Sequence, residues 1–344
     1  MLPFTWVYET FCDLYTNRTK KKFPFRLICE LDMTRLLYLL LRISGLPFLF
    51  REIFQRNRIT ILVAHNIRKE RAIKTISWLE RNYNIIDLDY LVDAMENGKK
   101  ADIPKKALIL TFDDGHIGNY EMLAVLKKMH IPVTIFLCSA LISTKRHYWF
   151  KHKDQVGDTI NLKRIPNQDR LNLLASAGFD QNKEYDIPQA LQNWHIEKMK
   201  PYVNFQSHTR YHPILPTCSD EEAREEISRS KKDLEKTYGL KVNAISYPNG
   251  DYSFRDIEFA KEAGYRCGLT VDFGFNTMKT DIFRLKRISI HEAANKNELV
   301  VKASGLWGFL ATWNGRRQGF GHMQPLKTSH QTVEAPFLHE HFVR

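Results

Sequence analysis

The chain carries two adjacent carboxylates and a glycine at the end of an apolar run, and this arrangement constrains the fold more than any other feature. The run Ala107-Leu108-Ile109-Leu110 leads directly into Thr111-Phe112-Asp113-Asp114-Gly115. An apolar strand with this ending places acidic side chains at the mouth of a sheet. Charges there cost free energy unless they are paired, hydrated or bound to a metal. The segment therefore predicts a buried strand with a polar site at its carboxyl end.

Strand-like and helix-like segments alternate along most of the chain. Repeated strand-helix units of this length are typical of a parallel α/β barrel. The candidate site residues all come just after predicted strands, at the end where barrel enzymes keep their chemistry. The predicted strands are 58–67, 108–112, 133–137, 202–206, 242–247, 265–271 and 283–290, and the predicted helices are 68–83, 89–96, 119–129, 219–238 and 254–263.

Two histidines follow another short apolar stretch, in the run Ser207-His208-Thr209-Arg210-Tyr211-His212. One carboxylate and two imidazoles form a three-ligand site with room left for water, as in catalytic zinc centres. We therefore predict Asp114, His208 and His212 as metal ligands. Neighbouring side chains on an extended segment point to opposite sides, so Asp113 is free to act as a base. The ligand types suit one Zn²⁺, and Co²⁺, Ni²⁺ or Mn²⁺ also fit them.

These motifs resemble the polysaccharide deacetylase family, also called the NodB-homology or carbohydrate esterase family 4 group. Residues 111–115 match its first motif, His208-x-x-x-His212 matches its second, and the run from Tyr247 through Pro248, Asn249 and Gly250 is similar to its third. The resemblance covers roughly residues 60–308. It implies a distorted (β/α) barrel of fewer than eight full units. The implied activity is metal-dependent hydrolysis of an N-acyl group, usually N-acetyl, from an amino sugar or polysaccharide of the cell envelope.

The resemblance also implies roles for single residues. Asp113 becomes the general base, and a backbone N–H near Asn249 becomes the donor that stabilises the oxyanion. His291 follows Ile288-Ser289-Ile290 and resembles the general acid of the fifth motif, although it is one step off the usual spacing. His65 and His116 lie at other strand ends and are further candidates near the same mouth.

The sequence departs from the family pattern in its third and fourth motifs. The family usually has an arginine before the Tyr-Pro step that orients the base, but residues 243–246 contain none, so another group must hold Asp113. The fourth motif retains only Asp272. Two alternatives stay open: a deformylase or deacetylase of a lipid-linked sugar at the inner membrane face, and a catalytically inactive carbohydrate-binding module.

Charge and cysteine content limit the partners and the compartment. The chain has 51 Lys and Arg against 39 Asp and Glu, a formal charge of +12, which favours an anionic partner such as a phospholipid surface. No nucleic-acid-binding motif accompanies this charge, so we expect no nucleic acid partner. The five cysteines are dispersed and odd in number, which favours a reducing compartment. No secretory signal is evident, and we expect a cytoplasmic protein, with a peripheral position at the inner membrane left open.

The chain divides into three predicted parts. Residues 1–57 form a basic, apolar and helical extension, in which the window 33–50 has the composition of a helix lying in a membrane interface. Residues 58–315 form the barrel, and 139–200 is too long for a simple connection. We interpret it as an insertion over the barrel mouth, where the aromatic run 147–150 either stacks on a sugar or covers barrel helices. Residues 316–344 lack periodicity and predict a loosely ordered tail.

Overall fold

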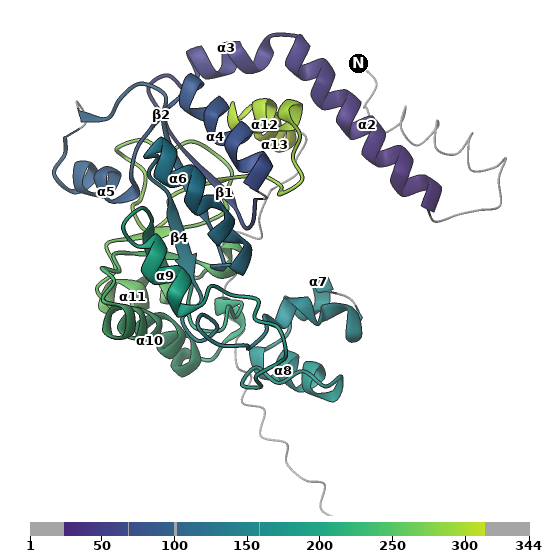
Figure 1. Ribbon diagram of the computed structural model, residues 1–344, viewed down its shortest axis with the longest axis vertical. Helices are drawn as coiled ribbons and strands as arrows, with labels where there is room; N and C mark the ends of the chain where they lie inside the picture. The colour runs from purple at the N-terminus through teal and green to yellow at the C-terminus, as the bar shows by residue number, and fades with distance from the viewer. Residues whose placement is uncertain (1–23, 68, 100–101, 158, 314–344) are drawn as a thin grey trace, which may run out of the picture.

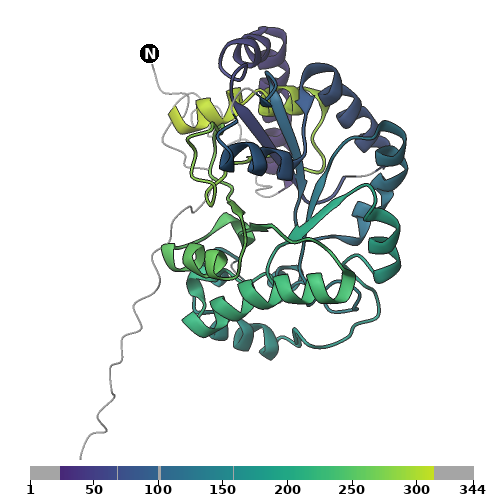
Figure 2. The same cartoon turned by 90° about the vertical axis from the view of Figure 1, so that its left-hand side faces the viewer.

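The computed structural model describes residues 24–313, except 68, 100, 101 and 158. Its centre is one curled sheet of parallel strands (Figure 2). The strand order is β7-β6-β5-β4-β3-β1-β8, and β2 pairs with β3 beside this path. The parallel α/β architecture predicted from the sequence is confirmed. The strands are β1 Ile59–Ala64, β2 Asn84–Ile85, β3 Ala107–Phe112, β4 Thr134–Leu137, β5 Asn204–Ser207, β6 Ala244–Ser246, β7 Cys267–Leu269 and β8 Ile288–Ser289.

The central strands are buried on both faces. All six residues of β1 and all six of β3 are buried. Ile61 belongs to one apolar cluster while its neighbour Leu62 belongs to the other, as alternating side chains of a strand require. These two clusters lie on the two faces of the sheet. The strands therefore form a rigid frame whose carboxyl ends hold the polar residues.

The last strand is much shorter than the sequence suggests, because its segment is shared between two neighbours. The N–H of Gly268 donates to the Ile282 carbonyl at 3.0 Å, and the N–H of Thr270 donates to the Leu285 carbonyl at 2.9 Å. The same segment then turns to β1, where the N–H of Ile290 donates to the Val63 carbonyl at 2.8 Å. Residues 282–290 thus connect the two ends of the sheet, and the result is a distorted barrel.

Helices cover the outside of the sheet (Figure 1). The longest of them, α10, starts with a capping box: the hydroxyl of Ser219 accepts from the N–H of Glu222, and the Glu222 carboxylate accepts from the N–H of Ser219. The covering helices are α4 Lys69–Asn82, α5 Leu88–Glu96, α6 Leu123–Met129, α9 Asn193–Met199, α10 Asp220–Tyr238, α11 Phe254–Glu262, α12 Lys296–Ala303 and α13 Leu306–Trp313.

The long connection between β4 and β5 forms a small subdomain of its own. It contains two 3-10 turns, η3 Trp149–Lys151 and η4 Lys153–Gln155, and two helices, α7 Thr159–Leu162 and α8 Asn167–Ser176, before it reaches α9. Figure 1 shows α7 and α8 apart from the helices that cover the sheet. This group has a separate apolar cluster, made of Trp149, Leu162, Leu174, Phe179 and Ile214.

Two helices precede the barrel. Helix α2 spans Pro24–Ile43 and helix α3 spans Leu46–Ile53, and they meet at Gly45, whose φ of +74° is available to glycine at little cost. No single described helix has both the length and the apolar content to cross a membrane, whereas this pair, bent by 60°, meets both requirements together. The predicted tail at 316–344 lies outside the described residues.

Candidate active site

The three predicted metal ligands come together at the carboxyl ends of the strands. Asp114 follows β3, while His208 and His212 lie in the loop after β5. Their ligand atoms all lie within 4.8 Å of one another, and all three residues are buried. Asp114 Oδ1 is 3.5 Å from His208 Nε2 and 3.4 Å from His212 Nε2.

The hydrogen bonds around these residues suit a cation. His208 Nδ1 lies 2.7 Å from the Ser246 carbonyl oxygen, which can only accept, so Nδ1 carries a proton and Nε2 is the ring nitrogen that can bind a cation. Asp114 Oδ1 is buried, and no described group donates a hydrogen bond to it. Burial lowers the pKa of His212 well below its usual value, and His208 adds to this effect. Two imidazole nitrogens and an unpartnered carboxylate oxygen are the donor set that a divalent metal binds.

Backbone strain is concentrated at the same place. Seven described non-glycine residues have positive φ, and among them are Asp114 at +73°, Thr209 at +64°, His212 at +59° and Asn249 at +58°. Each such residue costs on the order of 1 kcal/mol or more, and outliers of this kind gather at functional sites. Gly115 also has positive φ, and a Cβ there would lie 2.6 Å from Leu137 Cδ2. The strained backbone conformations therefore occur at the residues that position the predicted metal ligands.

Asp113 is held by a buried arginine. Arg287 Nη1 donates to Asp113 Oδ1 and Arg287 Nη2 donates to Asp113 Oδ2, both at 2.8 Å. The hydroxyl of Ser246 also contacts Oδ2, at 3.2 Å. Burial by itself raises the pKa of Asp113, but the guanidinium more than offsets this, and together with His208 it holds that pKa well below its usual range. Asp113 is therefore ionised and fixed in orientation.

Arg287 supplies the orienting arginine that the third motif lacks, and sequence reasoning did not find it. It lies in the segment that joins β7 to β1, where its Nε donates to the Thr270 carbonyl at 2.7 Å, and the residue is 1% exposed. The available signal was an arginine beside Ile288 in a segment predicted to be a buried strand. A charge in such a strand requires a partner, and Asp113 was the carboxylate in need of one.

Aromatic residues of the insertion contact the predicted metal ligands and hydrogen-bond to their backbone. The hydroxyl of Tyr148 donates to the Asp114 carbonyl at 2.7 Å, and Trp149 Nε1 donates to the His212 carbonyl at 2.8 Å. The rings of Phe150 and His212 meet edge to face, with centroids 5.0 Å apart. Tyr148 and Trp149 are 1% and 3% exposed, so their faces are not available to stack on a sugar.

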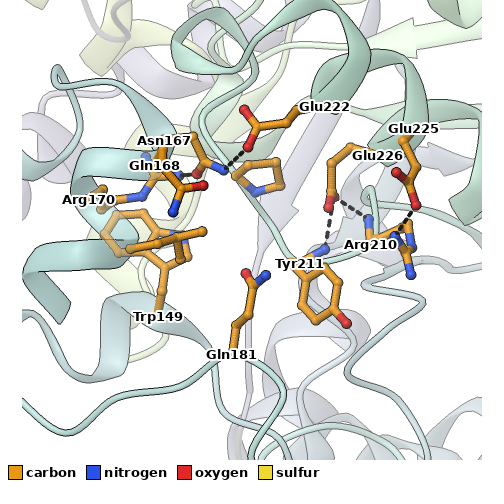
Figure 3. Close-up of a pocket in the computed structure, with 12 residues that line it drawn as sticks. Trp149, Asn167, Gln168, Arg170, Gln181, Arg210, Tyr211, Glu222, Glu225 and Glu226 are labelled. Carbon is orange, nitrogen blue, oxygen red and sulfur yellow. Dashed lines mark hydrogen bonds and ion pairs between the residues drawn. The ribbon is translucent and has the colours of Figure 1, made fainter. Parts of the chain in front are cut away.

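A cavity of about 190 Å³ lies beside the loop that carries His212 (Figure 3). Trp149 and helix α8 form one wall and helix α10 the other, with Tyr211 between them. The Arg170 guanidinium stacks on the Trp149 ring at 4.5 Å. Opposite, Glu226 Oε2 accepts from the N–H groups of Arg210 at 2.8 Å and Tyr211 at 2.9 Å, which fixes the loop just before His212.

The motif predicted to hold the oxyanion forms a tight turn after β6. The N–H of Tyr247 donates to the Leu269 carbonyl at 3.0 Å, and the N–H of Gly250 donates to the Tyr247 carbonyl at 2.8 Å. Pro248 has no N–H, so Asn249 is the residue of the motif 247–250 whose backbone N–H remains available as a donor. Gly250 is required here, because at φ +77° a Cβ would lie 2.1 Å from Val271 Cγ2.

Three other histidines follow strands at this end of the barrel. His65 follows β1 and is exposed, and a positive charge on its ring would lower the pKa of both Asp113 and Asp114. His116 is half-buried, its pKa is lowered by burial, and its Nδ1 accepts from the N–H of Gly118 at 3.1 Å. His291 is exposed after β8, and its Nδ1 accepts from the N–H of Ala293 at 3.0 Å. The role of His291 as general acid stays a prediction.

Residues 100–268, which contain the two carboxylates, the two histidines predicted as ligands and the predicted oxyanion turn, match the model of the polysaccharide deacetylase family. Residues 100–268 form a polysaccharide deacetylase domain. The family removes N-acetyl groups from polysaccharides, and the chain is accordingly a hydrolase of carbon–nitrogen bonds other than peptide bonds. The resemblance inferred from the motifs is thereby confirmed.

Similar proteins agree with this assignment. The putative polysaccharide deacetylase YxkH of Bacillus subtilis (strain 168) is 22% identical over 243 residues, which cover 68% of this chain and 71% of the relative. The deacetylase PplD of Streptococcus pyogenes, solved in complex with acetate, has a TM-score of 0.53 at 20% identity, covering 72% of this chain and 98% of that one. IcaB from Ammonifex degensii has a TM-score of 0.53 at 16% identity, with coverages of 72% and 97%. These structures show the same fold.

Proposed function

We propose that this deacetylase domain hydrolyses the N-acetyl group of an amino sugar in a cell-envelope polysaccharide or its precursor, and that it uses one divalent metal to do so. The proposal rests on one observation: two adjacent carboxylates have different environments. Asp113 is clamped by Arg287, while the unpartnered Asp114 Oδ1 faces the Nε2 atoms of His208 and His212. A catalytically inactive binding module needs neither a clamped carboxylate base nor a buried group of metal-binding side chains.

The metal would be held by Asp114, His208 and His212. A divalent cation there supplies Lewis-acid activation of the reacting groups. We propose Zn²⁺, because two imidazoles and one carboxylate form a ligand set typical of catalytic zinc, and Co²⁺, Ni²⁺ or Mn²⁺ are the alternatives. The Ser246 carbonyl fixes the tautomer of His208, and such contacts commonly decide metal affinity.

Other residues of the site would supply the general base, the oxyanion donor and the general acid. Asp113, ionised and fixed by Arg287, accepts the proton of the attacking water as general base. The N–H of Asn249 donates to the oxygen on which negative charge develops. A histidine then protonates the departing sugar nitrogen: the motif favours His291, while a position near enough to influence the pKa of both aspartates favours His65. Acetate leaves as the second product, the molecule with which the streptococcal relative was solved.

A second candidate substrate is a lipid-linked amino sugar, and the observation that favours it is the exposed apolar surface of α2 and α3. The two candidates differ in how the sugar is presented. A soluble N-acetylated oligosaccharide and the same sugar on a lipid carrier in vesicles would be hydrolysed equally by a polysaccharide enzyme, whereas an enzyme for lipid-linked sugars would prefer the second.

The test of the proposed function is acetate release from a panel of N-acetylated glycans, with Asp113→Asn as the matched control. We expect metal-dependent release of acetate from at least one glycan by the wild type and almost none by the variant. Binding of a glycan without any release by the metal-loaded wild type would instead identify an inactive binding module.

A further inference from the structure

An apolar surface covers the outer side of the two helices that precede the barrel. Ten of the eighteen exposed large apolar side chains in the described part of the chain fall within residues 33–54, which we call the apolar arm. Ile43, Phe48 and Ile53 are 69%, 57% and 66% exposed. The other seven are Met33, Leu36, Leu39, Leu40, Leu46, Leu49 and Phe54. A concentration of this kind marks an interaction surface.

The inner side of the arm is attached to the protein. Arg42 Nη1 donates to Asn297 Oδ1 of α12 at 2.6 Å, the Tyr38 ring packs against Trp307 with centroids 4.8 Å apart, and Phe50 packs against Phe309 at 5.2 Å. Figure 1 shows α2 and α3 on the outside of the molecule with α12 and α13 beneath them. The arm is thus a docked element with two apolar sides, only one of which the protein covers.

The charge around the exposed side is almost entirely positive. Residues 33–58 contain five arginines and a single acidic residue, Glu52, which pairs with Arg51 and Lys106. Arg35 and Arg56 are exposed and form no ion pair with any described residue. Apolar side chains flanked by arginines match a lipid surface with anionic headgroups, where the apolar groups enter the acyl region and the cations stay at the headgroups.

We propose that the apolar arm binds the surface of an anionic lipid bilayer. The competing occupant is a second copy of the chain, but a two-fold contact would bring together two arms that both carry this excess of arginine. The segments 1–23 and 314–344 each carry a net charge of +2, from four basic and two acidic residues, so neither supplies the missing negative charge. The proposal does not depend on the identity of the sugar substrate.

Vesicle co-sedimentation of the full chain tests the proposal. The probes are vesicles of phosphatidylcholine alone and of equimolar phosphatidylcholine and phosphatidylglycerol, at low and high salt. We expect the chain to bind the anionic vesicles and to bind them less at high salt. The double variant Ile43→Glu/Phe48→Glu should lower the partition coefficient by about tenfold or more, since it removes two apolar contacts and adds two negative charges.

The matched control is Ile73→Glu/Ile187→Glu, which changes two exposed isoleucines (46% and 73%) far from the arm in sequence and adds the same charge. It should bind nearly as the wild type does. A second variant, Arg35→Gln/Arg56→Gln, keeps the apolar side chains and should lose mainly the salt-dependent part of binding. Equal losses in the arm and control variants, or a wild type that binds neither vesicle, would overturn the proposal. A concentration-dependent dimer that Ile43→Glu/Phe48→Glu dissociates, without lipid binding, would show that a second copy covers the arm.

Discussion

Replacing Arg287 should change the pH dependence of the reaction as well as the stability of the protein. In the wild type the guanidinium binds both oxygens of Asp113 at 2.8 Å in a buried site. Two unit charges about 4 Å apart attract each other by about 4 kcal/mol at an effective dielectric constant of about 20. That energy corresponds to a pKa change of up to about 3 units. Arg287→Met removes this attraction, and burial then raises the pKa of Asp113 without opposition.

The sign of the pH effect follows from the direction of the wild-type shift. The folded-state pKa of Asp113 is depressed, so its stabilising contribution is present above the unfolded value near pH 4 and is lost as the pH falls through the folded value. The wild-type base is therefore ionised at any working pH. In Arg287→Met the folded pKa rises above the unfolded one, and the acid limb of kcat/KM should move upward by at least about one pH unit. The folded state should also lose about 3–5 kcal/mol, because a buried charge loses its partner.

The assay is the pH–rate profile for acetate release, measured on protein that circular dichroism shows to be folded. Arg287→Lys keeps the charge but cannot bind both oxygens, so its limb should lie between those of the wild type and the methionine variant. Arg255→Met is the matched control, because Arg255 also pairs with carboxylates, those of Asp220 and Asp256, but contacts neither aspartate of the site. An acid limb that stays at the wild-type position in folded Arg287→Met, or that moves equally in Arg255→Met, would refute the reasoning.

Three further predictions concern single residues. Asp113→Asn should retain the metal and lower kcat by about 10²–10⁴-fold, as loss of a general base does; near-normal turnover would assign the proton transfer elsewhere. His291→Ala should impair amide hydrolysis strongly and activated-ester hydrolysis little, because an amine needs protonation to leave; if His65→Ala shows this pattern instead, His65 is the acid. Burial raises the pKa of Glu226 to about 7, so its folded state binds a proton more tightly than its unfolded state. Urea unfolding at several pH values should therefore show that the free energy of unfolding of the wild type falls by about 2–3 kcal/mol relative to that of Glu226→Gln between about pH 5 and 8, and parallel curves would contradict this.

Much of the site could be predicted because its signals are local in sequence. Asp113 and Asp114 follow one apolar strand directly, and parallel strands bring His208 to the same edge. That Asp114, His208 and His212 lie close together could therefore be predicted before any contact was known. The contact between Arg287 and Asp113 could not, because it joins residues 174 positions apart through the segment that links β7 to β1. The hydrogen bond from Tyr148 to the Asp114 carbonyl could not be predicted either, because it depends on where the insertion packs in the folded chain.

In the fold, too, some elements could be predicted from the sequence and others could not. Strands such as β1 have a continuous apolar pattern and were predicted to within a few residues. The last strand was predicted as 283–290 but is β8 Ile288–Ser289, because its first half pairs with β7 and only its second half with β1. Hydrophobic pattern reports burial, which both halves share, and carries no information about which neighbour supplies the hydrogen bonds.

The measurement that tests the central claim most directly combines metal content with turnover. The chain is stripped of metal, titrated with Zn²⁺, and followed by mass spectrometry for bound metal and by acetate release from an N-acetylated oligosaccharide. The account predicts that turnover rises with Zn²⁺ and saturates at one metal per chain, and that His208→Ala neither binds the metal tightly nor turns over. Full turnover by the metal-free chain, or one tightly bound metal in His208→Ala with normal turnover, would contradict the assignment of Asp114, His208 and His212 as the catalytic metal site.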